Sequence, residues 1–135
     1  MRLADFENKN CDNEGFNTMK KWLENRNRGR TFVDYFHEYG YRTIAIYGAG
    51  DLGRLLFEEI KDSDIKVSYF VDRNGEGILE NEGIRVITVD RIKEMPLVDA
   101  IVITPVGNYE AISKALAIEA PELSTINLRE AVYEF

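Results

Sequence analysis

The sequence predicts an α/β protein built on a doubly wound, parallel sheet of five strands, with an extra pair of helices before it. Three observations support this fold class. From residue 41 onward, short apolar runs alternate with segments of helical periodicity. The expected strands are almost continuously apolar, which is typical of sheets covered on both faces. A Gly-x-Gly-x-x-Gly pattern directly follows the first strand, 43–47, and opens a helix.

The chain begins with two segments that such a sheet does not need. Residues 1–14 are polar and show no sustained periodicity, so we expect a loose arm, or one ordered only by a neighbouring chain. Residues 15–40 form a predicted helical extension. Its first helix has one apolar face, made by Phe16, Met19, Trp22 and Leu23.

The second helix of the extension is rich in aromatic residues. Thr31 begins a Thr-x-x-Asp motif that resembles a capping box, and Gly40 ends the helix. Because the chain is acidic, we interpret the aromatic face as a packing stripe and not as a platform for stacked bases. We expect the helical pair to cover a sheet edge or to form a dimer contact. The aromatic face comprises Phe32, Tyr35, Phe36 and Tyr39.

Residues 41–135 form the predicted sheet domain. Residues 73–83 hold three glycines and several carboxylates, so we expect an irregular loop there. Right-handed crossovers between successive parallel strands give the strand order 3-2-1-4-5, which is a Rossmann-like arrangement. Strands are expected at 43–47, 66–71, 84–89, 99–104 and 124–126. Helices are expected at 51–61, at 91–95, from Asn108 to near Pro121, and at 128–134.

This strand order predicts the position of a ligand crevice. The first and fourth strands are neighbours, and the chain reverses its direction of travel between them. Ligands of such sheets bind at that switch point, outside the carboxyl ends of the strands. The segments that follow three of the strands should therefore meet around one crevice, namely 48–53, 72–74 and 104–109.

Each glycine of the first turn has a predicted role in binding a dinucleotide. Gly48 allows the tight turn out of the strand, Gly50 lets a pyrophosphate approach the backbone, and Gly53 lets the helix pack closely. The helix N-terminus supplies N–H donors and a partial positive charge. The other residues of the predicted phosphate-binding turn are Ala49, Asp51 and Leu52.

Charged side chains around the crevice refine the expected ligand. Asp72 lies about 20 residues beyond the glycine turn, where a carboxylate accepts from the ribose hydroxyls of adenosine. It favours NAD over NADP, because a 2′-phosphate would meet its negative charge, whereas Arg73 could accept that phosphate. Asp51, as a predicted N-cap, would compete with an anion for the helix donors. Thr104 and Pro105 are placed to line the far half of the crevice.

Two alternatives to NAD stay open at this point. CoA is one, because the same turn can hold its pyrophosphate. The other is that no ligand binds, the glycines serving only the turn and Asp72 only the end of its strand.

Composition excludes several classes of function. The 17 Lys and Arg against 24 Asp and Glu give a net charge of −7, so the chain should repel nucleic acids and anionic membranes. It has no run of about 18 apolar residues and no signal-peptide core, so we expect a cytoplasmic protein without membrane insertion. One cysteine, Cys11, and one histidine, His37, cannot form a metal site, and His37 reads as an exposed helix residue. No set of catalytic residues is recognisable.

Four motifs of the sheet domain resemble those of the Rossmann-like nucleotide-binding domains of bacterial polysaccharide-biosynthesis proteins. That family includes the N-terminal domains of membrane-linked nucleoside-diphosphate-sugar epimerase/dehydratases, also described as CoA-binding-like. The resemblance implies dinucleotide contacts at Gly48, Gly50, Gly53 and Asp72, and it places the catalytic Thr/Tyr/Lys set of the epimerases in a separate domain. The motifs are Ile-Tyr-Gly-Ala-Gly-Asp-Leu-Gly-Arg (46–54), Tyr-Phe-Val-Asp-Arg-Asn (69–74), Gly-Ile-Arg-Val (83–86) and Asp-Ala-Ile-Val-Ile-Thr-Pro (99–105).

Three functions follow as hypotheses. The first is an NAD(H)-type dinucleotide-binding module, accessory to sugar-nucleotide or cell-surface polysaccharide metabolism. The second is a small oxidoreductase or epimerase whose active site is completed at an oligomer interface. The third is a Rossmann-like domain that contacts proteins and binds no nucleotide. For a second copy or a separate catalytic partner, the expected contact is the pair of N-terminal aromatic helices.

Overall fold

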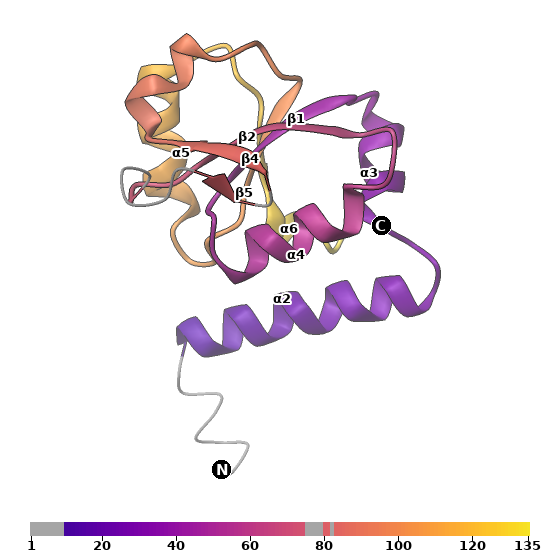
Figure 1. Cartoon of the computed structure of the whole chain (residues 1–135). Coiled ribbons are helices and arrows are strands. Elements are labelled where there is room, and N and C mark those ends of the chain that lie inside the picture. Colours follow the sequence, from indigo (N-terminus) through magenta and orange to yellow (C-terminus); the bar gives the residue numbers. More distant parts are fainter. Residues whose placement is uncertain (1–9, 75–79, 82) are drawn as a thin grey trace.

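The computed structural model describes residues 10–74, 80–81 and 83–135 and confirms the predicted α/β architecture (Figure 1). Among these residues the strand order is β3-β4-β2-β1-β5-β6. Five strands are parallel in the predicted order 3-2-1-4-5, and the short β3 pairs antiparallel with β4. The strands are β1 (Thr43–Tyr47), β2 (Lys66–Val71), β3 (Glu80–Asn81), β4 (Ile84–Ile87), β5 (Ala100–Ile103) and β6 (Thr125–Asn127).

Helices cover both faces of the sheet. One core holds the buried residues of α2, α3, α4 and α6, and the other holds those of η2 and α5. In β1, Ile44 and Ile46 enter the first core, whereas Ala45 and Tyr47 enter the second, which explains why the strand is continuously apolar. The helices are α2 (Asn10–Asn27), α3 (Phe32–Tyr39), α4 (Asp51–Ile60), the 3₁₀ helix η2 (Val89–Glu94), α5 (Tyr109–Glu119) and α6 (Leu128–Ala131).

The prediction of a loose polar arm is wrong from residue 10 onward, because α2 begins there. Residues 1–9 lie outside the described part of the chain. Contacts with the C-terminal helix hold α2 in place. The carboxylate of Glu14 pairs with Arg129 at 3.1 Å, and the amide of Asn25 donates to the carbonyl of Val132 at 2.7 Å. These contacts are long-range, so the local sequence pattern does not report them.

The apolar face predicted for α2 is mostly not the face that packs against the body. Of its four apolar residues only Trp22 is buried, and the other three, Phe16, Met19 and Leu23, are exposed. The side that faces the body carries Trp22 between two buried polar residues, Thr18 and Asn25, at helical spacing. The apolar stripe that periodicity detects therefore lies beside the buried stripe.

The aromatic helix α3 confirms the packing interpretation. Thr31 and Asp34 form a reciprocal capping box, and Gly40 ends the helix with a left-handed φ of 75°. His37 is exposed, as predicted, and its ring contacts Asp64 at 2.6 Å. Tyr39 is exposed, and the buried aromatic residues are Phe32, Tyr35 and Phe36.

A buried carboxylate on α4 joins the two N-terminal helices to the body. Glu59 accepts from the indole N–H of Trp22 at 3.0 Å and from the backbone N–H of Phe32 at 2.7 Å. The guanidinium of Arg26 lies 3.2 Å from the same carboxylate, whose side chain is only 2% exposed. One side chain therefore connects α2, α3 and α4.

The segment expected as an irregular loop, 73–83, contains β3, so that prediction is wrong for residues 80–81. Residues 75–79 and 82 of this segment lie outside the described residues. Strand β4 ends at Ile87, and η2 begins at Val89, earlier than the helix expected at 91–95. No helix within the described ranges has the length and apolar content needed to cross a bilayer.

Candidate functional site

The expected crevice exists at the carboxyl ends of β1, β2 and β5. It is a hollow of about 510 Å³. Segments from three strand ends and from the first turns of α5 line it, so residues that are far apart in the sequence meet there. The lining residues are Tyr47, Gly48, Asp72, Arg73, Asn74, Pro105, Asn108, Ala111, Ile112 and Ala115.

Backbone hydrogen bonds fix the turn that leaves β1. The N–H of Gly48 donates to the carbonyl of Val71 in the neighbouring β2 at 2.7 Å. On the other side, Thr104 donates both its N–H, at 3.0 Å, and its hydroxyl, at 2.7 Å, to the carbonyl of Tyr47. The buried Thr104 therefore positions the turn and does not line the crevice.

Two of the three glycines are required by the fold itself. Gly48 has a left-handed φ of 105°, and a Cβ there would lie 2.4 Å from the hydroxyl oxygen of Thr104. A Cβ on Gly53 would lie 1.9 Å from the carbonyl oxygen of Gly48. A side chain at either position would therefore displace the backbone or its hydrogen-bonded neighbour.

Gly50 differs from both. Its φ of −86° is open to any residue, and a Cβ there would have no described atom within 4 Å. The space in front of Gly50 is thus open, and the fold places no side chain in it.

The N-terminus of α4 lies at this open position. Gly50 is the N-cap, and no side chain in the described part of the chain caps the helix, so its first N–H groups lack partners. The prediction of Asp51 as N-cap is wrong, since it is the first helical residue and its exposed carboxylate pairs with Arg54 at 3.3 Å. Competition between Asp51 and an anion for the same N–H groups is therefore relieved.

Asp72 lies between the glycine turn and the loop after β2. One carboxylate oxygen accepts from the N–H of Ala49 at 2.9 Å, and the other accepts from the N–H of Asn74 at 2.9 Å. Each oxygen retains a lone pair for a further donor. The side chain is half-buried and lines the hollow, so a diol or another donor pair could reach it.

The remaining predicted site residues divide into two groups. Arg73 and Pro105 line the hollow, as does Asn108, which is also the N-cap of α5. Ala49 and Leu52 instead pack against the core on the α4 side of the sheet, and only the backbone of Ala49 contributes to the site, through Asp72.

The crevice also contains residues that the sequence did not indicate. Ala111 and Ala115 are one turn apart on α5 and, with Ile112, provide a small apolar wall. Tyr47 contributes a phenol from the end of β1. Burial, and then the negative charge of Asp72, raise the pKa of Tyr47, so at neutral pH this phenol is a hydrogen-bond donor and not a base.

The hollow combines hydrogen-bonding groups with apolar side chains. Its titratable lining residues, within the described ranges, are Tyr47, Asp72 and Arg73. No three His, Cys, Asp or Glu side chains of the described residues converge as metal ligands. The hollow has a fixed carboxylate acceptor and an apolar wall. Of the predicted turn 48–53, only Gly48 lines it, and the uncapped N-terminus of α4 begins three residues further along the chain, at Asp51.

One comparison with known proteins produced a match. A family model described as C2185-like, N-terminal, matches residues 40–124, which cover most of the sheet domain and the whole crevice but not α2 or α3. No curated protein and no solved structure matches the chain.

Proposed function

This chain belongs to the C2185-like N-terminal family, and from its crevice we propose that it binds the adenosine diphosphate part of an NAD(H)-type dinucleotide. The single observation that carries this proposal is the open position at Gly50. In the described structure, neither packing nor backbone conformation requires a glycine at position 50, whereas they do at Gly48 and Gly53. A pyrophosphate in that space would accept from the uncapped N–H groups of α4.

The position of Asp72 supports the same ligand. Its two oxygens are held by backbone donors at the turn and at the loop, so the carboxylate has a fixed orientation beside the hollow. A ribose with two free hydroxyls suits such an acceptor pair. NAD is favoured over NADP for this reason, and Arg73 is the residue that would accept a 2′-phosphate. CoA shares the pyrophosphate and is the third candidate.

The adenine ring would lie against the apolar wall of α5. Ala111, Ile112 and Ala115 present small and branched side chains beside Pro105. Such a wall is typical of ligand sites, in which a few polar groups set the orientation and apolar contacts supply the area.

We assign the chain a binding role, with the reacting groups supplied by a separate catalytic protein or by a second copy. The acceptor and donor groups of the crevice suit recognition, and the phenol of Tyr47 stays protonated at neutral pH. On the basis of the resemblance to polysaccharide-biosynthesis proteins, we propose that this binding serves sugar-nucleotide metabolism in the cytoplasm. The partner contact would involve the N-terminal helices.

Calorimetric titration and thermal unfolding with NAD, NADH, NADP, CoA, AMP and a UDP-sugar test the proposal. We expect saturable binding of NAD or NADH, with about 2.7 kcal/mol of stabilisation at 100 times the dissociation constant. Gly50→Val fills the open space, and Asp72→Ala removes the acceptor, so each should abolish binding in a folded protein. Asp62→Asn is the control, because Asp62 is exposed beyond the other end of α4, away from the proposed site, and binding should persist. Absence of binding by every nucleotide would leave a domain that contacts only proteins.

A further inference from the structure

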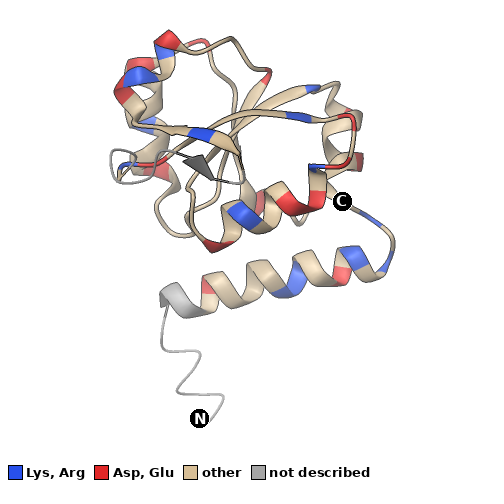
Figure 2. Ribbon diagram, in the orientation of Figure 1, with Lys and Arg blue, Asp and Glu red and all other residues tan. Residues whose placement is uncertain are grey.

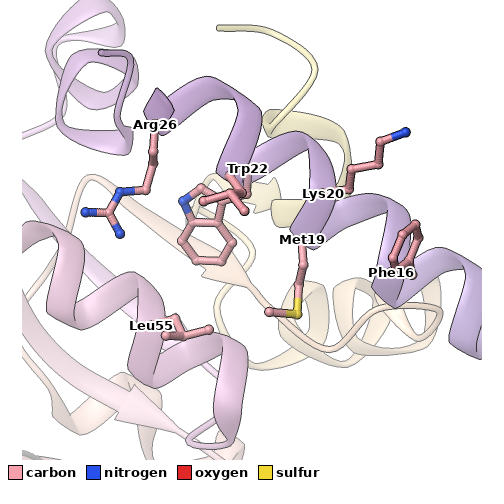
Figure 3. Close-up of a pocket in the computed structure, with 7 residues that line it drawn as sticks. Phe16, Met19, Lys20, Trp22, Arg26 and Leu55 are labelled. Carbon is pink, nitrogen blue, oxygen red and sulfur yellow. The ribbon is translucent and has the colours of Figure 1, made fainter. Parts of the chain in front are cut away.

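A second hollow of about 510 Å³ lies between α2 and α4. Met19 and Trp22 of α2 and Leu55 of α4 face it from opposite sides, and Phe16 lies farther along α2 (Figure 3). The groove is apolar, with Lys20 among the residues that line it. It has no residue in common with the nucleotide crevice.

The groove exposes an unusual amount of apolar side chain. Phe16 is 53% exposed, Met19 47%, Leu23 60% and Leu55 39%. Single exposed apolar residues are normal, but four around one groove form a contiguous patch of the kind that marks an interaction site. Phe16, Met19 and Leu23 follow the i, i+3, i+7 spacing of a helix–helix contact.

We propose that two copies of this chain associate through the groove. A twofold axis that passes between α2 and α4 would lay α2 of each copy across α4 of the other, so the same patch forms both sides of the interface. The proposal goes beyond nucleotide binding and does not depend on it.

Charge complementarity selects a second copy as the occupant. Residues 10–30 hold five basic and three acidic residues, whereas residues 31–135 hold ten basic and nineteen acidic residues. Helix α2 itself holds three residues of each sign, and the excess of basic residues lies in 20–30, with five basic residues and one acidic. This basic segment belongs to an otherwise acidic chain and would find an acidic surface on another copy. Figure 2 shows residues of both signs on α2 and on α4.

The same complementarity holds beside the groove. Lys20 lines it from α2 and is exposed, and Glu58 is exposed on α4, one turn beyond Leu55. No ion pair within the described residues involves Lys20 or Glu58. In the proposed dimer, Lys20 of one copy lies near Glu58 of the other, and the symmetry makes this pair twice.

The size of the face is compatible with a dimer. Eighteen helical residues span about 27 Å, and two helices side by side are about 20 Å wide. Their projected area of roughly 500 Å² is of the same order as the about 800 Å² that each partner contributes to a stable interface.

Sedimentation equilibrium of the 135-residue chain, across a concentration series at about 0.15 M salt, tests the dimer. Leu23→Glu places a carboxylate in the apolar patch twice per dimer, so we expect the dissociation constant to rise at least about a hundredfold. Ile118→Glu is the matched control, because Ile118 is an 81% exposed apolar residue on α5, away from the groove, and dimerisation should be unchanged. Circular dichroism at low concentration checks that each variant is folded.

A charge exchange identifies the partner as a second copy. Lys20→Glu and Glu58→Lys should each weaken self-association about tenfold, whereas a mixture of the two variants should form a heterodimer, in which every Lys–Glu contact is complementary. A chain that stays monomeric at all concentrations overturns the proposal, as does a dimer that survives Leu23→Glu. A monomer that dimerises only after deletion of residues 1–9 also overturns it, since those residues would then be the occupant.

Discussion

The crevice at the carboxyl ends of β1, β2 and β5 and the α2/α4 groove have the same volume, about 510 Å³, and opposite chemistry. Backbone donors and acceptors shape the crevice, and it lies inside the segment that matches the family. Apolar side chains shape the groove, and α2, which forms one wall, lies outside that segment. Fixed polar groups suit one small ligand in one orientation, whereas an exposed apolar patch suits a macromolecule. Changes at one site should therefore leave the other intact.

The largest effect is expected at the glycine turn beside the crevice, where Gly53 and Gly50 differ. Gly53→Ala places a Cβ 1.9 Å from the carbonyl oxygen of Gly48, so the turn must move, and we expect a loss of about 4 kcal/mol in the free energy of unfolding, or no folding. Gly50→Ala meets open space and an ordinary φ, so its stability should change by less than about 1 kcal/mol. Urea denaturation of both variants measures the difference. Equal losses would mean that Gly50, too, serves only the fold.

The next effect concerns the N-terminal helices. Glu59→Ala leaves the indole N–H of Trp22 and the backbone N–H of Phe32 without their acceptor, so we expect a loss of about 2–3 kcal/mol. Its neighbour Glu58 is exposed, and Glu58→Ala should change stability by less than about 0.5 kcal/mol. Urea denaturation gives both values, and a nucleotide titration of Glu59→Ala should show unchanged affinity. Lost nucleotide binding in a folded Glu59→Ala protein would show that the two regions are coupled.

The two regions also differ in how far the sequence predicts them. The order of strand, glycines and helix is local, and it correctly places Gly48, Asp72, Arg73 and Pro105 around one crevice. It does not separate the glycines that the fold needs from Gly50, because that distinction depends on neighbours distant in the sequence, such as Thr104 beside Gly48. Tyr47 ends the strand expected at 43–47, and the apolar pattern of that strand does not indicate that its phenol reaches the crevice.

For α2 the sequence predicts a helix with an apolar face, but not the side that packs against the body. Helical periodicity detects an apolar stripe, but it does not tell which side of the helix meets the body. The buried side is selected by polar contacts: Asn25 with Val132, and Trp22 with Glu59. These partners lie at least 37 residues away. Most of the apolar stripe is consequently the exposed wall of the groove.

A smaller effect is expected at the carboxylate of the crevice. Asp72→Asn keeps one acceptor oxygen but turns an NH₂ group toward either Ala49 or Asn74, so one hydrogen bond is lost. We expect NAD affinity to fall about ten- to thirtyfold, or 1.4–2 kcal/mol, and dimerisation to stay unchanged. Arg73→Ala should weaken NADP more than NAD. Calorimetry with both nucleotides measures these changes, and an unaltered NAD affinity in Asp72→Asn would remove the ribose contact from the proposal.

The smallest effect belongs to a carboxylate at the opposite end of β1. Asp99 accepts from the N–H of Arg42 at 2.7 Å and from that of Thr43 at 3.0 Å, and these two bonds, the Arg42 bond first, lower its pKa from 3.8. Because the pKa is lower in the folded state, the stabilisation is present above about pH 4 and is lost as the pH falls through the lowered value.

Asp99→Asn should therefore lower the urea midpoint slightly at about pH 6, and the difference from the unaltered chain should vanish as the pH falls below the lowered pKa of Asp99. Nucleotide affinity should not change, because Asp99 contacts the first residues of β1, whereas the crevice lies beyond the last one. A difference in urea midpoint that grows as the pH falls would have the opposite sign. It would contradict the assignment of the stabilisation to the charged form of Asp99. Asp72 and Asp99 each accept from two backbone N–H groups, and only the one beside an open space is expected to bind a ligand.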